Sequence, residues 1–288
     1  MSALRDAVSG ALGRRVGDLR SVAGGDLNDA FAAELQDGGR VFVKASADAA
    51  PGAFTREAEG LAWLAEPGAL AVARVLAVAD EPPSPRFLAL EWIDRGSPRA
   101  ATDEQLGRGL SALHAAGAPS FGGDHDIVLG PLTLPNAAAA GWPEFYATRR
   151  LAPLARIAAD RGALPAGALE LLDRLVGRLD DLCGPDEPPA RLHGDLWSGN
   201  VLTDGDGRSW LIDPAAYGGH REVDLAMLSL FGSPGAGLHA AYREATPLAD
   251  GYEDRVALWQ VMPLLAHAAL FGGGWGTSAV SAMRRYVG

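Results

Sequence analysis

The hydrophobic pattern of this chain changes its period near residue 93, and this change constrains the fold more than any other feature. Before it, short apolar runs alternate with turn residues, as in RVFVKA at 40–45 and RFLALEWI at 86–93. Such runs, bounded by Gly, Asp and Pro, predict β-strands. The segment AFTREAEGLAWLAE at 53–66 instead spaces its apolar residues as a helix does. We therefore expect a small antiparallel sheet with one helix, in the order β, β, β, α, β, β.

The rest of the chain has helical spacing. TDEQLGRGLSALHAAG, at 102–117, has Thr102 as its expected N-cap and Gly117 as its stop signal. The short apolar runs NVLTD and SWLID predict strands within this region. Further helices are expected at about 141–160, 166–183, 222–231 and 253–271.

These patterns predict an α+β chain of two lobes that share a cleft. Residues 1–93 would form a β-rich N-lobe, and residues 94–288 a larger, mainly helical C-lobe. The length of 288 residues is sufficient for both lobes to bury a core.

Composition excludes several classes of protein. With 48% hydrophobic and 21% charged residues, the chain resembles an ordinary globular protein. Its formal charge of -11 argues against nonspecific nucleic-acid binding, which needs a basic surface. The single Cys183, expected to be a buried apolar residue, rules out an internal disulfide. No apolar segment reaches the roughly 18–20 residues that cross a membrane, so we expect a cytoplasmic protein with no nucleic-acid or membrane partner.

A dense group of polar residues, RLHGDLWSGN at 191–200, lies between apolar runs and suggests a reaction site. Asp195 is followed five residues later by Asn200, and Asp213 ends the next apolar run. This arrangement suits phosphoryl transfer, with Asp195 accepting a proton from the attacking hydroxyl and Asn200 and Asp213 holding Mg²⁺. Oxygen ligands are those that Mg²⁺ prefers. For His193, a structural role in holding the loop is favoured over a catalytic one.

The N-terminal third offers groups for the opposite wall of such a site. A glycine turn, GGDLN, lies between the strand-like runs LRSVAG and AFAAEL, and its backbone N–H groups could cover phosphates. Lys44 ends the run VFVK and could contact the α- and β-phosphates. Glu57 on the following helix is its expected partner, and Glu59 remains the competing one.

The order of these features is that of a protein-kinase-like two-lobed phosphotransferase. More closely, LHGDLWSGN followed by DPAAYGGHREVDLAM, with GWPEFYATRRL upstream and LFGG downstream, resembles the fructosamine kinase (ketosamine 3-kinase) family. The resemblance covers about residues 18–286. HGDxxxxN alone is shared with aminoglycoside, choline and homoserine kinases, whereas the Trp197-Ser198-Gly199 insert and DPA are specific to fructosamine kinases.

The resemblance implies ATP- and Mg²⁺-dependent phosphorylation of the sugar 3-hydroxyl of a ketosamine, which destabilises the adduct and so repairs glycated amines. The substrate would be a fructosamine or ribulosamine, as a small molecule or on a glycated protein. By position, the resemblance implies the following site residues: Asp195 as the base, Asn200 and Asp213 as metal ligands, Lys44 and Glu57 as the phosphate-side pair, and Gly24, Gly25, Asp26 and Asn28 over the nucleotide.

Three further positions follow from the resemblance. The backbone of LEWI at Glu91 and Ile93 resembles the hinge that recognises adenine. Trp197 would border the sugar, with a core tryptophan as the alternative. Asp224 in EVDLA would support the catalytic loop.

The chain departs from the family at two positions. Asp26 stands where some relatives carry a redox-active cysteine, so we expect no such regulation, and Ala266 stands where the resemblance implies an Asn. The roles of His193, His220 and Ala266 stay open, as do the sugar, the amine and the oligomeric state. The alternatives are a kinase of another small hydroxyl compound, such as an aminoglycoside, choline or homoserine, and a nucleotide-sensing pseudokinase.

Overall fold

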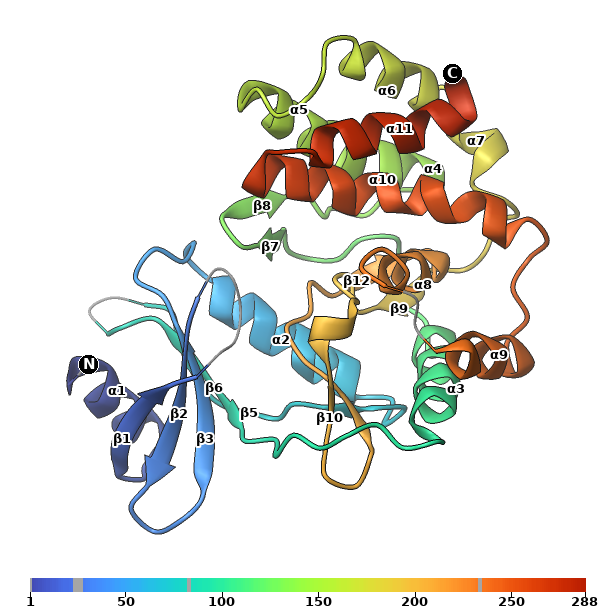
Figure 1. The fold of residues 1–288 in the computed structure, drawn as a ribbon. Helices are drawn as coiled ribbons and strands as arrows, with labels where there is room; N and C mark the ends of the chain where they lie inside the picture. Colours follow the sequence, from blue (N-terminus) through green and yellow to red (C-terminus); the bar gives the residue numbers. More distant parts are fainter. Residues whose placement is uncertain (1, 23–27, 82–83, 233–234) are drawn as a thin grey trace.

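A computed structural model describes residues 2–22, 28–81, 84–232 and 235–288 (Figure 1). The N-terminal part contains a five-stranded antiparallel sheet of order β1-β2-β3-β6-β5. Its elements are α1 (Ser2–Leu12), β1 (Val16–Ser21), β2 (Asp29–Leu35), β3 (Arg40–Ala45), α2 (Ala53–Ala65), β4 (Ala71–Val72), β5 (Val75–Ala79) and β6 (Phe87–Glu91).

The two faces of this sheet pack against different helices, because side chains alternate along a strand. On β3, Val41 and Val43 pack on the side of α1, whereas Phe42 packs with residues of α2. The same alternation on β6 places Phe87 toward α1 and Leu88 toward α2. An even-numbered residue of β3 therefore faces α2, and this applies to the lysine at its end.

The C-terminal part is mainly helical, as the sequence predicts (Figure 1). Its helices are α3 (Thr102–Ala115), α4 (Trp142–Phe145), a π-helical turn η1 (Tyr146–Leu151), α5 (Ala152–Asp160), α6 (Ala168–Val176), α7 (Leu179–Leu182), a 3₁₀ turn η2 (Ser198–Asn200), α8 (Glu222–Leu228), α9 (Ala236–Ala245), α10 (Tyr252–Phe271) and α11 (Trp275–Val287). Its strands are β7 (Ile127–Leu129), β8 (Leu132–Leu134), β9 (Ala190–Leu192), β10 (Val201–Thr203), β11 (Ser209–Leu211) and β12 (Tyr217–Gly219).

The two parts are tied together by a shared sheet and a shared core. β4 pairs in parallel with β11 through Ala71 and Val72. One hydrophobic cluster combines Phe54 and Leu61 of α2 with Leu110 of α3 and with residues of the later loops and helices. The polar residues between β9 and β11 are therefore anchored by apolar neighbours from both parts.

Several elements differ from the sequence expectations. The order begins with α1, which was not predicted, and the first strand covers 16–21 instead of 19–24. α9, α11 and the short strands β7, β8, β9 and β12 were also not predicted. Each of these four strands has three residues, which is too short to display a period of two.

Two of the predicted helix signals had different outcomes. Thr102 as N-cap is wrong, because Ala101 occupies that position and the Thr102 hydroxyl accepts the N–H of Arg99. Gly117, by contrast, follows the end of α3 with φ 73°, as a glycine stop signal should. The predicted DGG hairpin turn is confirmed between β2 and β3, where Gly38 and Gly39 both have positive φ.

Candidate active site

The polar loop that follows β9 requires glycine at its tightest point. Gly194 has φ 82°, and a Cβ there would lie 2.0 Å from the carbonyl oxygen of Ala215. A second glycine, Gly199, lies beneath an aromatic ring, since a Cβ there would lie 2.2 Å from the Trp197 side chain. Gly194 thus allows the tight turn before Asp195, whereas Gly199 leaves room for the Trp197 ring.

Asp195, Asn200 and Asp213 lie together, joined by the Asn200 amide. The Nδ2 group of Asn200 donates to the backbone oxygen of Asp195 at 2.9 Å, to Oδ2 of Asp195 at 3.1 Å and to the backbone oxygen of Asp213 at 3.4 Å. Asp213 has φ 53°, a positive value found at no other non-glycine residue of the described chain. Strained backbone of this kind is concentrated at functional sites.

Lys44 reaches this group from the sheet. Its Nζ lies 2.8 Å from Oε2 of Glu57 and 3.1 Å from Oδ1 of Asp213. Glu59 instead pairs with Arg56 at 2.6 Å. Burial lowers the pKa of Lys44, but the charges of Glu57 and Asp213 outweigh it and hold that pKa above its usual value. The lysine therefore stays protonated between its two carboxylates.

The partner of Lys44 is explained by the register of α2. Glu57 lies three residues after Phe54 and four before Leu61, so it lies on the buried stripe of the helix. Glu59 falls on the opposite side. Burial, and then the charge of Asp213, raise the pKa of Glu57 to about 7 against the opposing effect of Lys44.

The carboxyl group of Asp195 is a stronger base than an ordinary aspartate. Burial raises its pKa to about 6, and the nearby charge of Asp213 adds to this, while the hydrogen bond from Asn200 opposes it. A general base works best with a pKa near the working pH. The environment therefore suits Asp195 to accepting a proton.

The loop backbone is held from below by Asp224 on α8, which is fully buried. Its Oδ2 accepts the N–H of His193 at 2.7 Å, and its Oδ1 accepts the N–H of Gly194 at 3.0 Å. Burial alone would raise the pKa of Asp224, but its hydrogen bond and charge interaction with His114, and those with His193, hold it below the usual value. Asp224 thus fixes the backbone immediately before Asp195.

His193 makes the contacts of a structural histidine. Its Nδ1 lies 3.3 Å from the backbone N–H of Asp195, and its Nε2 lies 2.9 Å from the backbone oxygen of Ile212. A neutral ring with hydrogen on Nε2 satisfies both contacts. Burial lowers the pKa of His193, which favours this neutral form.

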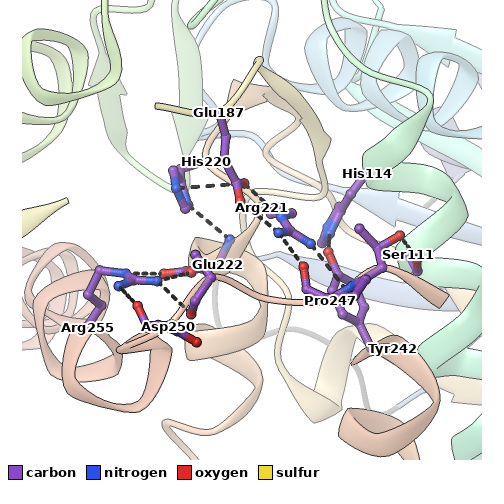
Figure 2. A network of polar contacts seen from close by, with 12 residues as sticks. Ser111, His114, Glu187, His220, Arg221, Glu222, Tyr242, Pro247, Asp250 and Arg255 are labelled. Atoms are coloured by element: carbon purple, nitrogen blue, oxygen red, sulfur yellow. Dashed lines mark hydrogen bonds and ion pairs between the residues drawn. The ribbon is translucent and has the colours of Figure 1, made fainter. Parts of the chain in front are cut away.

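A polar network that the sequence reasoning missed anchors α8 to its neighbours (Figure 2). His114 on α3 lies 3.3 Å from Asp224 and 2.8 Å from the hydroxyl of Tyr242. On the other side, the fully buried Glu222 accepts two hydrogen bonds from Arg255, at 2.6 and 2.9 Å. A charged residue in an otherwise apolar helix such as EVDLAML was the available signal, because buried charges need partners.

His220 belongs to the same network (Figure 2). Its Nδ1 accepts the N–H of Glu222 at 3.3 Å, and its ring stacks on Trp259 with centroids 5.1 Å apart. Arg221 beside it forms a bidentate pair with Glu187, both bonds measuring 2.7 Å. These contacts give His220 a structural place beneath the loop.

A cavity of about 1050 Å³ opens beside the group of Lys44, Asp195 and Asp213. Its lining includes Asn28, Lys44, Asp195 and Asp213, and also Ala266 on α10. A volume of this order accommodates a drug-sized ligand. Trp197 also lines the cavity and is only partly buried, so the alternative of a core tryptophan is wrong.

Most of the residues predicted to contact the nucleotide are not placed at the cavity by the described structure. Gly24, Gly25 and Asp26 lie outside the described residues. Glu91 and Ile93 are not part of the cavity lining in the described structure. Glu91 ends β6, where its N–H donates to the backbone oxygen of Arg74 and its carboxylate accepts the N–H of Arg74.

The residues proposed for magnesium offer oxygen donors of the right kind. The described residues contain no group of three or more His, Cys, Asp or Glu placed to hold a metal. Asn200 and Asp213 could nevertheless supply two ligands, because Mg²⁺ commonly takes one or two protein ligands and completes its shell with phosphate and water. Three donations from Nδ2 leave the Asn200 amide oxygen to serve as the ligand. Nearby, Oε1 of Glu57 is buried without a hydrogen-bond partner.

A strand lysine that is held by a helix glutamate and contacts an Asp-Asn-Asp grouping at the wall of a cavity defines a phosphotransferase of the two-lobed, protein-kinase-like class. The comparison with known families agrees with this architecture. The chain belongs to the fructosamine kinase family, whose model matches residues 2–288.

Relatives cover almost the whole chain. A protein of Synechocystis named as a candidate ketoamine kinase is 34% identical over 277 residues, covering 94% of this chain and 90% of the relative. The chloroplastic protein-ribulosamine 3-kinase of Arabidopsis thaliana is 32% identical over 275 residues, covering 93% and 82%.

Solved structures agree in fold. A crystal structure from Thermobifida fusca, of a protein assigned as a candidate fructosamine-3-kinase, has a TM-score of 0.91 and 42% identity, covering 99% of this chain and 98% of the other. A thermostable mutant of an aminoglycoside phosphotransferase has a TM-score of 0.66 at 18% identity, with 98% of each chain covered, which shows the shared fold alone. Within the described residues, no helix is both long and apolar enough to cross a membrane.

Proposed function

We propose that this chain is an ATP-dependent ketosamine kinase that phosphorylates the sugar 3-hydroxyl of fructosamines or ribulosamines. The observation that carries the proposal is the 3.1 Å contact between Lys44 of the sheet and Asp213 of the loop region, beside Asp195. This contact brings a phosphate-binding cation and a proton-accepting carboxylate to one cavity. Family membership, and relatives named for ketoamines and ribulosamine, support the ketosamine as acceptor.

In the proposed mechanism, Asp195 orients the attacking hydroxyl and accepts its proton. Lys44, fixed by Glu57, contacts the phosphates of ATP. Asn200 and Asp213 would hold Mg²⁺, and the ion would supply neutralisation of charge on the triphosphate. The phosphorylated product would then lose its amine, which gives the enzyme a repair function on glycated small molecules or proteins.

The nucleotide contacts form part of the same proposal. Gly24, Gly25, Asp26 and Asn28 would cover the phosphates, and the backbone at Glu91 and Ile93 would meet the adenine. Residues 1–93 would act as the nucleotide-binding lobe and residues 94–288 as the lobe that binds the acceptor, with Trp197 bordering the sugar. The position of Trp197 in the cavity lining supports this last assignment.

The proposal is tested by ADP release with a panel of acceptors. Fructosamine and ribulosamine adducts should be phosphorylated, whereas kanamycin, choline and homoserine should be inert. Asp195→Asn should lower kcat by roughly 10²–10⁴-fold, the range that general-base catalysis contributes, and should retain ATP binding. Asp206→Asn, at a side chain that is 96% exposed, is the matched control and should keep wild-type turnover.

Three results would contradict the proposal. Turnover of kanamycin, choline or homoserine with inert ketosamines would assign the chain to another group of small-molecule kinases. Near-normal turnover by Asp195→Asn would show that Asp195 is not the general base. A rise in the Tm of the wild-type protein with Mg²⁺-ATP, without phosphorylation of any acceptor in the panel, would favour the pseudokinase alternative.

A further inference from the structure

We propose that an aromatic wall of the cavity binds the substituent on the amine of the ketosamine and makes the enzyme prefer apolar or aromatic amines. The aromatic wall consists of Trp197, Phe231, His267, Phe271 and Trp275, all of which line the cavity. This inference rests on the proposed function, since it concerns the acceptor of the same reaction.

The rings of the aromatic wall form a continuous surface. Trp197 meets Phe231 edge-on, with centroids 5.7 Å apart. Phe231 in turn contacts His267 at 5.1 Å and Trp275 at 5.9 Å. His267 extends the surface to Phe271 at 5.6 Å. The wall thus runs from the catalytic loop to α10 and α11, which are adjacent in Figure 1.

The exposure of this surface is unusual within the described chain. The exposed large hydrophobic residues are Val78, Leu169, Phe231 and Phe271, and the last two belong to the aromatic wall. Phe231 is 39% exposed and Phe271 is 50% exposed. Single exposed apolar residues are ordinary, but apolar residues gathered in one cavity indicate a binding surface.

The position of the aromatic wall relative to Asp195 indicates which part of the acceptor it meets. Trp197 is two residues from Asp195, so a sugar whose 3-hydroxyl faces Asp195 has its ring or chain beside Trp197. In a ketosamine the amine is on C1, two carbons from C3, and its substituent extends further. The rings beyond Trp197 are therefore placed to meet the amine and its substituent.

The charge of the cavity also suits a protonated amine. Its lining contains exposed carboxylates at Asp124 and Asp126. The lining cations Lys44 and Arg56 are already paired with carboxylates. A secondary ammonium beside aromatic faces gains cation–π attraction, and an apolar substituent gains from burial against the rings.

The test compares two adducts that share a sugar and differ in the amine. The fructose adducts of benzylamine and of methylamine, and the corresponding ribulose adducts, are assayed by ADP release at saturating ATP. We expect the wild type to have a kcat/KM roughly tenfold higher for the benzylamine adduct, the scale on which apolar pockets discriminate. Phe231→Ala should bring this ratio close to one, mainly through KM.

Further variants make the comparison specific. Trp275→Ala, at the start of α11, should lower the ratio in the same direction. Phe231→Leu should retain part of the preference, since it keeps apolar area and loses the ring. Leu169→Ala, at a residue of α6 that is 44% exposed and absent from the cavity lining, is the control and should keep the wild-type ratio. Because Phe231 is partly exposed, its truncation should leave the Tm within about 2 °C of wild type.

The outcomes separate this inference from the function on which it rests. If the wild type phosphorylates both adducts with equal kcat/KM, or if Phe231→Ala and Trp275→Ala keep the wild-type ratio, the aromatic wall does not recognise the amine, while the ketosamine kinase function stands. If the wild type phosphorylates no ketosamine of either sugar, the proposed function itself is overturned and the inference falls with it.

Discussion

Substitution of Asp224 tests how the loop that carries Asp195 is held in place. The Asp224 carboxylate is fully buried and accepts backbone N–H groups from His193 and Gly194, at 2.7 and 3.0 Å. In Asp224→Asn, one acceptor oxygen becomes an NH₂ group, so one of these two N–H groups loses its partner. A hydrogen bond to a charged group contributes about 1.5–3 kcal/mol. The free energy of unfolding should fall by about that amount.

This loss corresponds to a Tm lowered by about 3–12 °C, taking about 2–4 °C per kcal/mol for chains of 150–250 residues. The loop that carries Asp195 should also shift. A misplacement on the order of 1 Å costs roughly 10²-fold in rate, so kcat should fall by about 10- to 100-fold. Asp224→Ala removes both acceptors and should cost about 3–6 kcal/mol.

Thermal unfolding and ADP release measure the two effects separately. The control is Asp206→Asn, which makes the same chemical change at a side chain that is 96% exposed and should alter stability by less than about 0.5 kcal/mol. An Asp224→Asn protein with a wild-type Tm and a wild-type kcat would show that the loop does not depend on these two hydrogen bonds.

Other predictions follow from the same contacts. Glu57→Gln should raise the KM for ATP by roughly tenfold, since a lost buried charge partner costs at least ~1.4 kcal/mol, whereas Glu59→Gln should leave it unchanged; equal effects would refute the pairing. Gly194→Ala should lower kcat strongly, because its Cβ has no space at φ 82°, and Gly205→Ala, where nothing lies within 4 Å, should not. Burial lowers the pKa of His220, so the unfolded chain binds more protons below about pH 6.5 and stability should decrease from that pH downward. The free energy of unfolding, measured in urea at pH 7.5 and 5.5, should differ less between the two pH values in His220→Gln than in the wild type. An equal difference in both proteins would contradict this prediction.

The local part of the site could be predicted from the sequence. Asp195 and Asn200 are separated by five residues in one loop, and the Asn200 amide indeed bonds to Asp195. The face of β3 on which Lys44 lies is also determined locally, because alternation along VFVK places the lysine opposite Val41 and Val43.

The sequence contained enough information to choose Glu57 over Glu59 as the partner of Lys44. Phe54, Glu57 and Leu61 follow one another at three- and four-residue intervals, so the helical period alone places Glu57 on the buried stripe. A carboxylate on such a stripe needs a cation. The sequence did not identify that both Glu57 and Asp213 would share Lys44.

Two of the missed helices, α1 and α9, share a cause. Both contain much Gly and Ala, whose weak hydrophobic contrast obscures the helical period. They form helices in the folded protein because Leu4 and Val8 of α1, and Leu238 and Tyr242 of α9, are buried by neighbours distant in the chain.

The sequence by itself determined the two kinds of secondary structure, the loop that carries Asp195 and Asn200, and membership of the fructosamine kinase family. Only the tertiary structure decided that Asp224 supports that loop through the N–H groups of His193 and Gly194. It also decided that His114 reaches Asp224 from 110 residues away, and that Phe231 and Trp275 join Trp197 in one wall. The physical reason is that hydrophobic period and turn chemistry act over a few residues, whereas buried charges and exposed rings gain their partners only when distant helices pack together.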